Sequence, residues 1–167
     1  MEMTVAETEG GATGAAGSAA DLAVLWSGRT VGAGLLVWMG WIHLHLWNEG
    51  YKHIHTIGPM FMANFVAAIA TAIALLAVPS RRLIAVTAAA GAALASGTLG
   101  GLALSVNVGL FGFTDSWNAP FAHLSLGVEV AAAAVLVVTA GWALVRPLPR
   151  ELRSEPGAGA QSGHSAE

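Results

Sequence analysis

The sequence predicts an all-α protein, a four-helix transmembrane bundle in up-down-up-down order. Its composition is the first indication: apolar residues make up 55% of the 167 residues and charged residues only 10%. Soluble domains usually carry about 25% charged residues. The second indication is that the few charges lie outside long apolar runs. The third is that four such runs each approach the ~20 residues that a helix needs to cross a bilayer.

The four apolar runs define the predicted spans, at about residues 30–47, 59–78, 83–108 and 119–145. Pro59 suits the first turn of the second span, where its missing N–H costs nothing. Asn118 is a suitable N-cap for the fourth span, with Pro120 in the first turn. The connections are short, so we expect neighbouring helices to be antiparallel.

The two ends of the chain lack apolar runs. Residues 1–27 are rich in Ala, Gly, Ser and Thr, and residues 147–167 in Pro, Gly and Ser. Such segments bury too little apolar surface to order themselves. We therefore expect disordered tails on either side of one transmembrane domain at 28–146. The first tail is acidic where a secretory signal peptide is basic, so we do not expect it to be a cleaved signal.

The distribution of Lys and Arg predicts the orientation. With four spans, both tails and the 79–82 connection share one side of the membrane, which holds all six Arg residues, while the other side holds Lys52. The positive-inside rule then places both termini in the cytoplasm of a bacterial cell. Residues 43–62 and 109–123 would face outward. The expected partner is the lipid bilayer, and the net charge of −3 gives no reason to expect nucleic acid.

Histidines gather on the predicted outer side, as His43, His45, His53, His55 and His123. Met60 begins the second span at the same level. Imidazole and thioether ligands suit copper, and imidazole alone suits zinc or haem iron. The candidate ligands of copper or zinc are His43, His53, His55, His123 and Met60. His43 and His123 are also candidates to hold a single haem b. The simpler alternative is a set of interfacial histidines that hold no ion.

Helical spacing separates two of these histidines. His43 and His45 are two residues apart, so they point to nearly opposite sides of a helix. His43 shares its stripe with small residues such as Gly32 and Gly40, which predicts that it faces the bundle. His45 shares its stripe with tryptophans and is expected to point elsewhere.

Glu129 lies within the fourth predicted span. An intramembrane carboxylate is a functional-site hypothesis by default. One alternative is a hydrogen bond to Asn64 that ties two helices together, and the other is a proton or cation relay. Gly97 and Gly101 form a G-x-x-x-G pair, which predicts close helix packing within the bundle or, alternatively, a homo-oligomer or larger membrane complex through that face.

The string HLHLWNEGYKHIHTIGPMFMAN, from His43 to Asn64, and the segment GLFGF at 109–113 resemble small four-span integral membrane proteins of high-GC Gram-positive bacteria. The resemblance covers the four spans, implies the membrane fold and carries no activity.

No motif for a catalytic residue is present, and the chain has no Cys for disulfides or thiolate sites. The leading hypothesis is a non-enzymatic accessory or small binding protein with a His/Met-rich outer face. The alternatives are a copper-handling, zinc-handling or single-haem membrane protein, and a small proton-linked transporter that uses Glu129.

Overall fold

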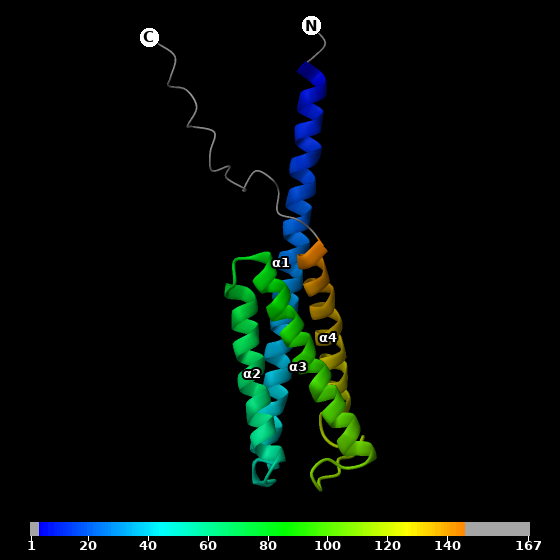
Figure 1. Ribbon diagram of the computed structural model, residues 1–167. Coiled ribbons are helices and arrows are strands. Elements are labelled where there is room, and N and C mark those ends of the chain that lie inside the picture. The colour runs from blue at the N-terminus through cyan, green and yellow to red at the C-terminus, as the bar shows by residue number, and fades with distance from the viewer. Residues whose placement is uncertain (1–3, 146–167) are drawn as a thin grey trace, which may run out of the picture.

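The computed structural model describes the backbone of residues 4–145 and the side chains of residues 17–145. Residues 4–145 form four α-helices and one short 3₁₀ helix, namely α1 (Thr4–Glu49), η1 (Tyr51–His53), α2 (Ile57–Ala77), α3 (Arg81–Asn107) and α4 (Ala122–Val145). They form an up-down-up-down bundle, from which the first part of α1 projects as a single helix (Figure 1). The predicted all-α four-helix fold is confirmed.

All four α-helices are long and apolar enough to cross a membrane. The segments with this character are Gly17–Glu49, Ile57–Ala77, Arg81–Asn107 and Ala122–Val145. Each predicted span overlaps one of them, as expected for a multi-pass membrane protein. Many of their apolar side chains are exposed, among them Ile73, Val86 and Val137, and a lipid environment would cover these surfaces.

The first helix begins earlier than the sequence predicted. α1 starts at Thr4, whereas residues 1–27 were expected to be disordered. Ala is the best helix former, and adding residues to an existing helix costs far less than starting one. The Ala-rich segment therefore extends α1 towards the N-terminus from the part that packs in the bundle, where Leu25 is already buried. The predicted tail at 147–167 lies outside the described residues.

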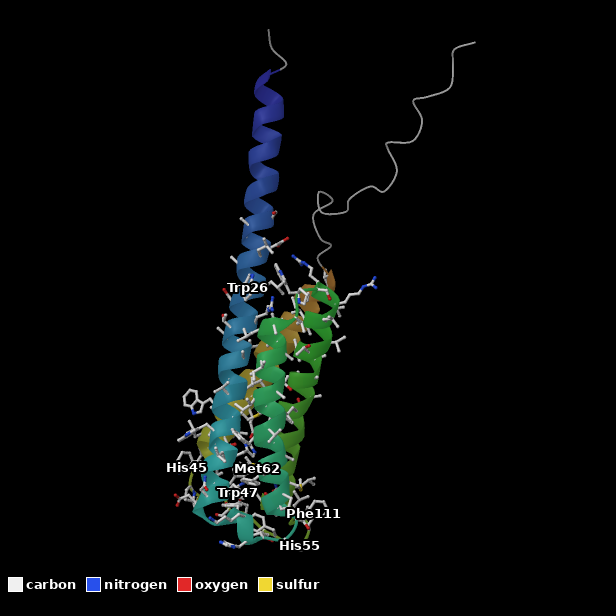
Figure 2. All side chains as sticks on the ribbon, turned by 90° about the vertical axis from the view of Figure 1, so that its left-hand side faces the viewer. Trp26, His45, Trp47, His55, Met62 and Phe111 are labelled. Carbon is white, nitrogen blue, oxygen red and sulfur yellow. The ribbon has the colours of Figure 1, made fainter. Side chains whose placement is uncertain are left out.

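The two ends of the bundle differ in their connections. At one end, which we call the Arg29 end, a short turn at 78–80 joins α2 to α3, and Ser80 caps α3 by accepting a hydrogen bond from the backbone N–H of Leu83 at 3.3 Å. At the other, the His43 end, η1 joins α1 to α2, and residues 108–121 join α3 to α4. Trp26 lies towards the first end and His55 at the second (Figure 2).

Arg29 ties α1 to the C-terminus of α2. Its Nε donates a hydrogen bond to the carbonyl of Leu75 at 2.8 Å, and Nη2 donates to those of Leu76 at 2.6 Å and Val78 at 2.9 Å. The last carbonyls of a helix have no partner within the helix, so this buried guanidinium satisfies them. From the sequence, Arg29 was only one of the positive charges that predict the orientation, and its contact with α2 was not expected.

The core of the Arg29 half of the bundle is closely packed, and a separate hollow lies between α1 and α4 at this end. Leu36, Leu75 and Leu136, from three different helices, are completely buried. A Cβ atom added at Gly32 would lie 2.7 Å from Leu136 Cδ2, and one at Gly91 would lie 3.0 Å from Leu136 Cδ1. Glycine at both positions therefore leaves room for the end of the Leu136 side chain and favours close approach of the helices.

Candidate functional site

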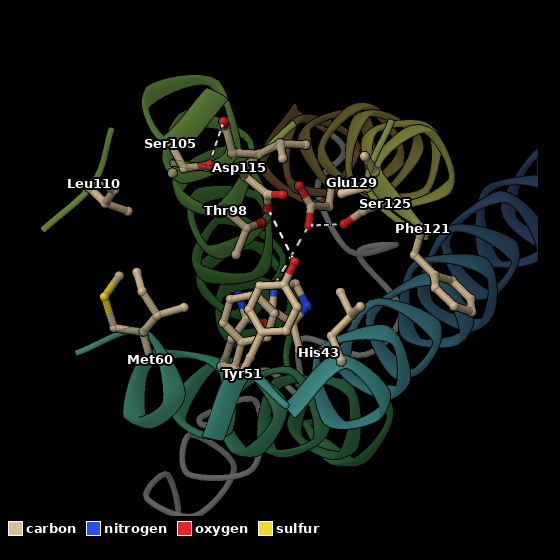
Figure 3. Close-up of a pocket in the computed structure, with 18 of the residues that line it drawn as sticks. His43, Tyr51, Met60, Thr98, Ser105, Leu110, Asp115, Phe121, Ser125 and Glu129 are labelled. Atoms are coloured by element: carbon tan, nitrogen blue, oxygen red, sulfur yellow. Dashed lines mark hydrogen bonds and ion pairs between the residues drawn. The ribbon is translucent and has the colours of Figure 1, made fainter. Parts of the chain in front are cut away.

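The His43 half of the bundle contains a cavity of about 320 Å³. All four α-helices, η1 and the 108–121 connection contribute residues to it. Its walls are mainly apolar and aromatic, with a small set of polar side chains (Figure 3). Cavities of this size with a few convergent polar groups are typical of sites for small molecules.

Glu129 lies at the deep end of the cavity and is only 1% exposed. Ser125, one turn earlier on α4, donates a hydrogen bond to Glu129 Oε1 at 2.8 Å. The other carboxyl oxygen, Oε2, is buried without a hydrogen-bond partner. Asn64 lines the same cavity, but the carboxyl group accepts its hydrogen bond from Ser125.

His43 faces the bundle, as its helical stripe predicted, and is 8% exposed. Its Nδ1 lies 2.9 Å from the carbonyl oxygen of Met39. A carbonyl can only accept, so Nδ1 carries the hydrogen and donates it. Nε2 is directed towards Glu129 Oε1 at 3.9 Å. In the neutral ring, Nε2 therefore presents its lone pair to the cavity.

The deep end of the cavity is rich in hydrogen-bond acceptors. Asn64 is 8% exposed and its Oδ1 is buried without a partner, as Glu129 Oε2 is. The neutral form of His43 adds Nε2, whose 3.9 Å distance from Glu129 is too long for a hydrogen bond. Buried polar atoms are nearly always paired in proteins. Two unpaired buried acceptors, with Nε2 of His43 directed to the same region, therefore match a ligand that donates hydrogen bonds.

Tyr51 and Asp115 lie nearer the outside of the cavity. The Tyr51 hydroxyl donates a long hydrogen bond of 3.5 Å to Asp115 Oδ2. Its ring stacks on that of Phe61 at 4.8 Å between centroids and meets that of Phe113 edge-on at 5.6 Å. Burial raises the pKa of Tyr51, and the nearby Asp115 carboxylate raises this pKa further. The backbone N–H of Asp115 donates to the carbonyl of Ser105 at 3.2 Å, which holds the loop against α3.

The remaining histidines of the predicted outer cluster lie elsewhere. His45 stacks on Trp41, with ring centroids 5.1 Å apart. His53 and His55 are exposed around η1. His123 is exposed on α4 and stacks on Trp117 at 6.3 Å.

Only two of the five candidate metal ligands, His43 and Met60, therefore line the cavity. Within the described residues, no group of three or more His, Cys, Asp and Glu side chains is arranged to hold a metal ion. The prediction of copper or zinc binding gains no support from this arrangement. A haem held between His43 and His123 would need the two rings to face each other. His123 is instead exposed beside Trp117.

One of the two alternatives predicted that Gly97 and Gly101 pack against another helix of the bundle. They do not. A Cβ atom added at either position would have no neighbouring atom within 4 Å. Both residues instead line the cavity. Their lack of side chains is part of what leaves the space open.

No family model, curated protein or solved structure matches this chain.

Proposed function

We propose that this chain is a non-enzymatic binding protein of a bacterial cell membrane, and that the cavity at its His43 end holds a small organic amine. In this proposal the His43 end faces away from the cytoplasm, in agreement with the predicted orientation. Glu129, Asn64 and His43 receive the ammonium group of the ligand. The apolar walls receive its hydrocarbon part.

One observation carries the proposal: the deep end of the cavity offers acceptors that no protein donor uses. Glu129 Oε2 and Asn64 Oδ1 are buried and unpaired, and His43 directs Nε2 to the same region. An unpaired buried polar atom costs about 1–3 kcal/mol. An ammonium group has several N–H donors on one atom, so a single ligand group would satisfy more than one of these acceptors.

The charges and aromatic rings around the cavity favour a cation. Glu129 and Asp115 line it, and no Lys or Arg does among the described residues. Tyr51 and Phe61 contribute stacked rings to its wall, and aromatic faces attract ammonium groups. An anionic ligand would find no complementary charge there.

The packing of the Arg29 half favours binding over transport. Leu36, Leu75 and Leu136 are completely buried there, and the helices meet closely at Gly32 and Gly91. A transporter that uses Glu129 would need a passage through this half. The conformation described here instead gives the cavity a closed inner end.

The proposal is tested by equilibrium binding to the full chain in phosphatidylcholine nanodiscs. Tritiated phenethylamine is the probe, and empty nanodiscs provide the background. We expect saturable binding that Glu129→Gln weakens roughly tenfold or more, because a hydrogen bond to a charged group is worth about 1.5–3 kcal/mol. Asn64→Leu should weaken binding as well.

Glu49→Gln is the matched control. It makes the same chemical change at a side chain on α1 that is 65% exposed and does not line the cavity. Its affinity for phenethylamine should equal that of the unmodified protein. Absence of saturable binding, or equal affinities for Glu129→Gln and Glu49→Gln, would falsify the proposal.

A further inference from the structure

We propose that the ligand is a single-chain amphiphilic amine, and that its hydrocarbon chain leaves the cavity sideways, between α2 and α3, into the bilayer. This inference rests on the proposed function, because it takes the amine site at Glu129 as given. It adds the class of ligand and the direction from which the ligand enters.

The cavity opens at the side of the bundle. Met60 on α2 is 42% exposed and lines the cavity, and so do the exposed residues Ala93 and Gly97 on α3. In Figure 1, α2 and α3 are joined at the Arg29 end and diverge towards the His43 end. Met60 and Leu110 both lie on the left of Figure 3, away from Glu129. The opening therefore faces the region that lipid would occupy.

The α3 wall of the opening is smooth enough to hold a hydrocarbon chain. Ala93, Gly97 and Gly101 are spaced four residues apart, so they share one face of the helix, and all three line the cavity. A side chain at Gly97 or Gly101 would project into open space. Ala93 lies about 20 Å along the helix from its end at Asn107, so this face extends well into the span.

The polar end of the site lies at a depth suited to the head of such a molecule. Asn64 and Glu129 each lie seven residues, or about 10 Å, from the His43 end of their helices. A headgroup held there leaves its chain beside the opening, at the level of the lipid tails. An amine that enters from the membrane reaches this point without passing the rings of Tyr51, Phe61 and Phe113.

Two other occupants fit the site less well. A phospholipid would bring a phosphate group to a cavity that contains Asp115 and Glu129 and is lined by neither Lys nor Arg in the described part of the chain. A helix from a second copy would cover the small residues of α3. Within the described residues, however, the Lys and Arg residues are Arg29, Lys52, Arg81 and Arg82. Lys52 lies in η1, Arg81 and Arg82 begin α3, and the guanidinium of Arg29 is already bonded to the end of α2. A second copy would therefore bring no cationic donor to Glu129 Oε2 or Asn64 Oδ1.

The test compares two amines on the full chain in phosphatidylcholine nanodiscs. The affinity for phenethylamine reports on the amine site alone. The affinity for n-dodecylamine, measured by competition with tritiated phenethylamine, reports on the site and the opening together. Gly97→Leu fills the opening, whereas Gly100→Leu makes the same change at a glycine that also has open space but does not line the cavity. Gly97→Leu should weaken the binding of dodecylamine roughly tenfold, because about two methylene groups lose their contacts. The affinity for phenethylamine should stay within about threefold of that of the unmodified protein. Gly100→Leu should change neither affinity.

The possible outcomes separate the two proposals. If phenethylamine fails to bind the unmodified protein, the amine site itself is refuted. If phenethylamine binds and Gly97→Leu leaves dodecylamine unchanged, only the sideways chain is refuted. A larger particle that dissociates in Gly97→Leu with no change in dodecylamine affinity would identify a second copy as the occupant. Displacement of phenethylamine by phosphatidylethanolamine as efficiently as by dodecylamine would identify a lipid headgroup and overturn the assignment.

If Gly97→Leu weakens both amines alike, Ala93→Leu decides, because it lies about one turn farther from the end of α3. The same selective loss of dodecylamine is then required. Equal dodecylamine affinities for Ala93→Leu and the unmodified protein would overturn the inference.

Discussion

Replacement of Arg29 by Met removes the guanidinium that joins α1 to the end of α2. The three hydrogen bonds to Leu75, Leu76 and Val78 are 2.6–2.9 Å long. Hydrogen bonds to charged groups contribute about 1.5–3 kcal/mol each. At the lower value, loss of all three would reduce the free energy of unfolding by about 4.5 kcal/mol. Met keeps much of the apolar stem, so the loss reports mainly on the polar head.

The assay is reversible unfolding of the full chain in mixed micelles, followed by tryptophan fluorescence. Arg82→Met is the matched control, because Arg82 is an exposed residue at the same end of the bundle, and it should change the free energy by less than about 0.5 kcal/mol. A loss below about 1 kcal/mol for Arg29→Met would refute the view that Arg29 stabilises the end of α2.

Two further predictions concern the connection between α1 and α2. Tyr51 is the only tyrosine in the chain, so absorbance at about 295 nm should report its pKa directly. This pKa should lie above the ordinary tyrosine value. Asp115→Asn should lower the pKa without restoring the ordinary value, because burial is the larger cause of the shift. Because the pKa of Tyr51 is raised in the folded state, its contribution to stability is present below the ordinary tyrosine pKa and is lost as the pH rises through the folded-state pKa. An equal Tyr51 pKa in Asp115→Asn and the unmodified protein would contradict the role of Asp115. Gly58→Ala should destabilise the protein by about 1–3 kcal/mol, because the added Cβ would lie 2.8 Å from a backbone carbonyl oxygen of η1. Gly34→Ala, with no atom nearby, should be neutral or slightly stabilising, and equal unfolding free energies for the two variants would show that η1 yields to the added methyl group.

The architecture was predictable because it depends on long runs of apolar residues. A helix in lipid must satisfy its backbone internally, so an apolar run of about 20 residues has few alternatives to a spanning helix. The extension of α1 to Thr4 was not predictable in the same way. The same Ala-rich residues are compatible with a disordered tail when considered alone, and their helical state depends on the helix that follows them.

The candidate site was only partly predictable. Helical phase correctly placed His43 inside the bundle, and the position of Glu129 within an apolar run marked it as an intramembrane carboxylate. Both signals are local. Phase within one helix does not tell which helices face each other, so the contact between His43 and Glu129 could not be derived. For the same reason, the level of His123 suggested a shared site, although the structure directs it towards Trp117.

The positions of Gly97 and Gly101 show why a small residue alone does not identify a helix interface. Gly32 and Gly91 bring helices together because large side chains such as Leu136 press against them. At Gly97 no such side chain faces the glycine. α3 starts close to α2 because the short turn at 78–80 joins them, and the two helices then separate towards the His43 end (Figure 1). Small residues placed along that separation widen the gap instead of closing it. The arrangement that packs the Arg29 half therefore also creates the cavity, and the buried acceptors at its end give that space a chemical preference.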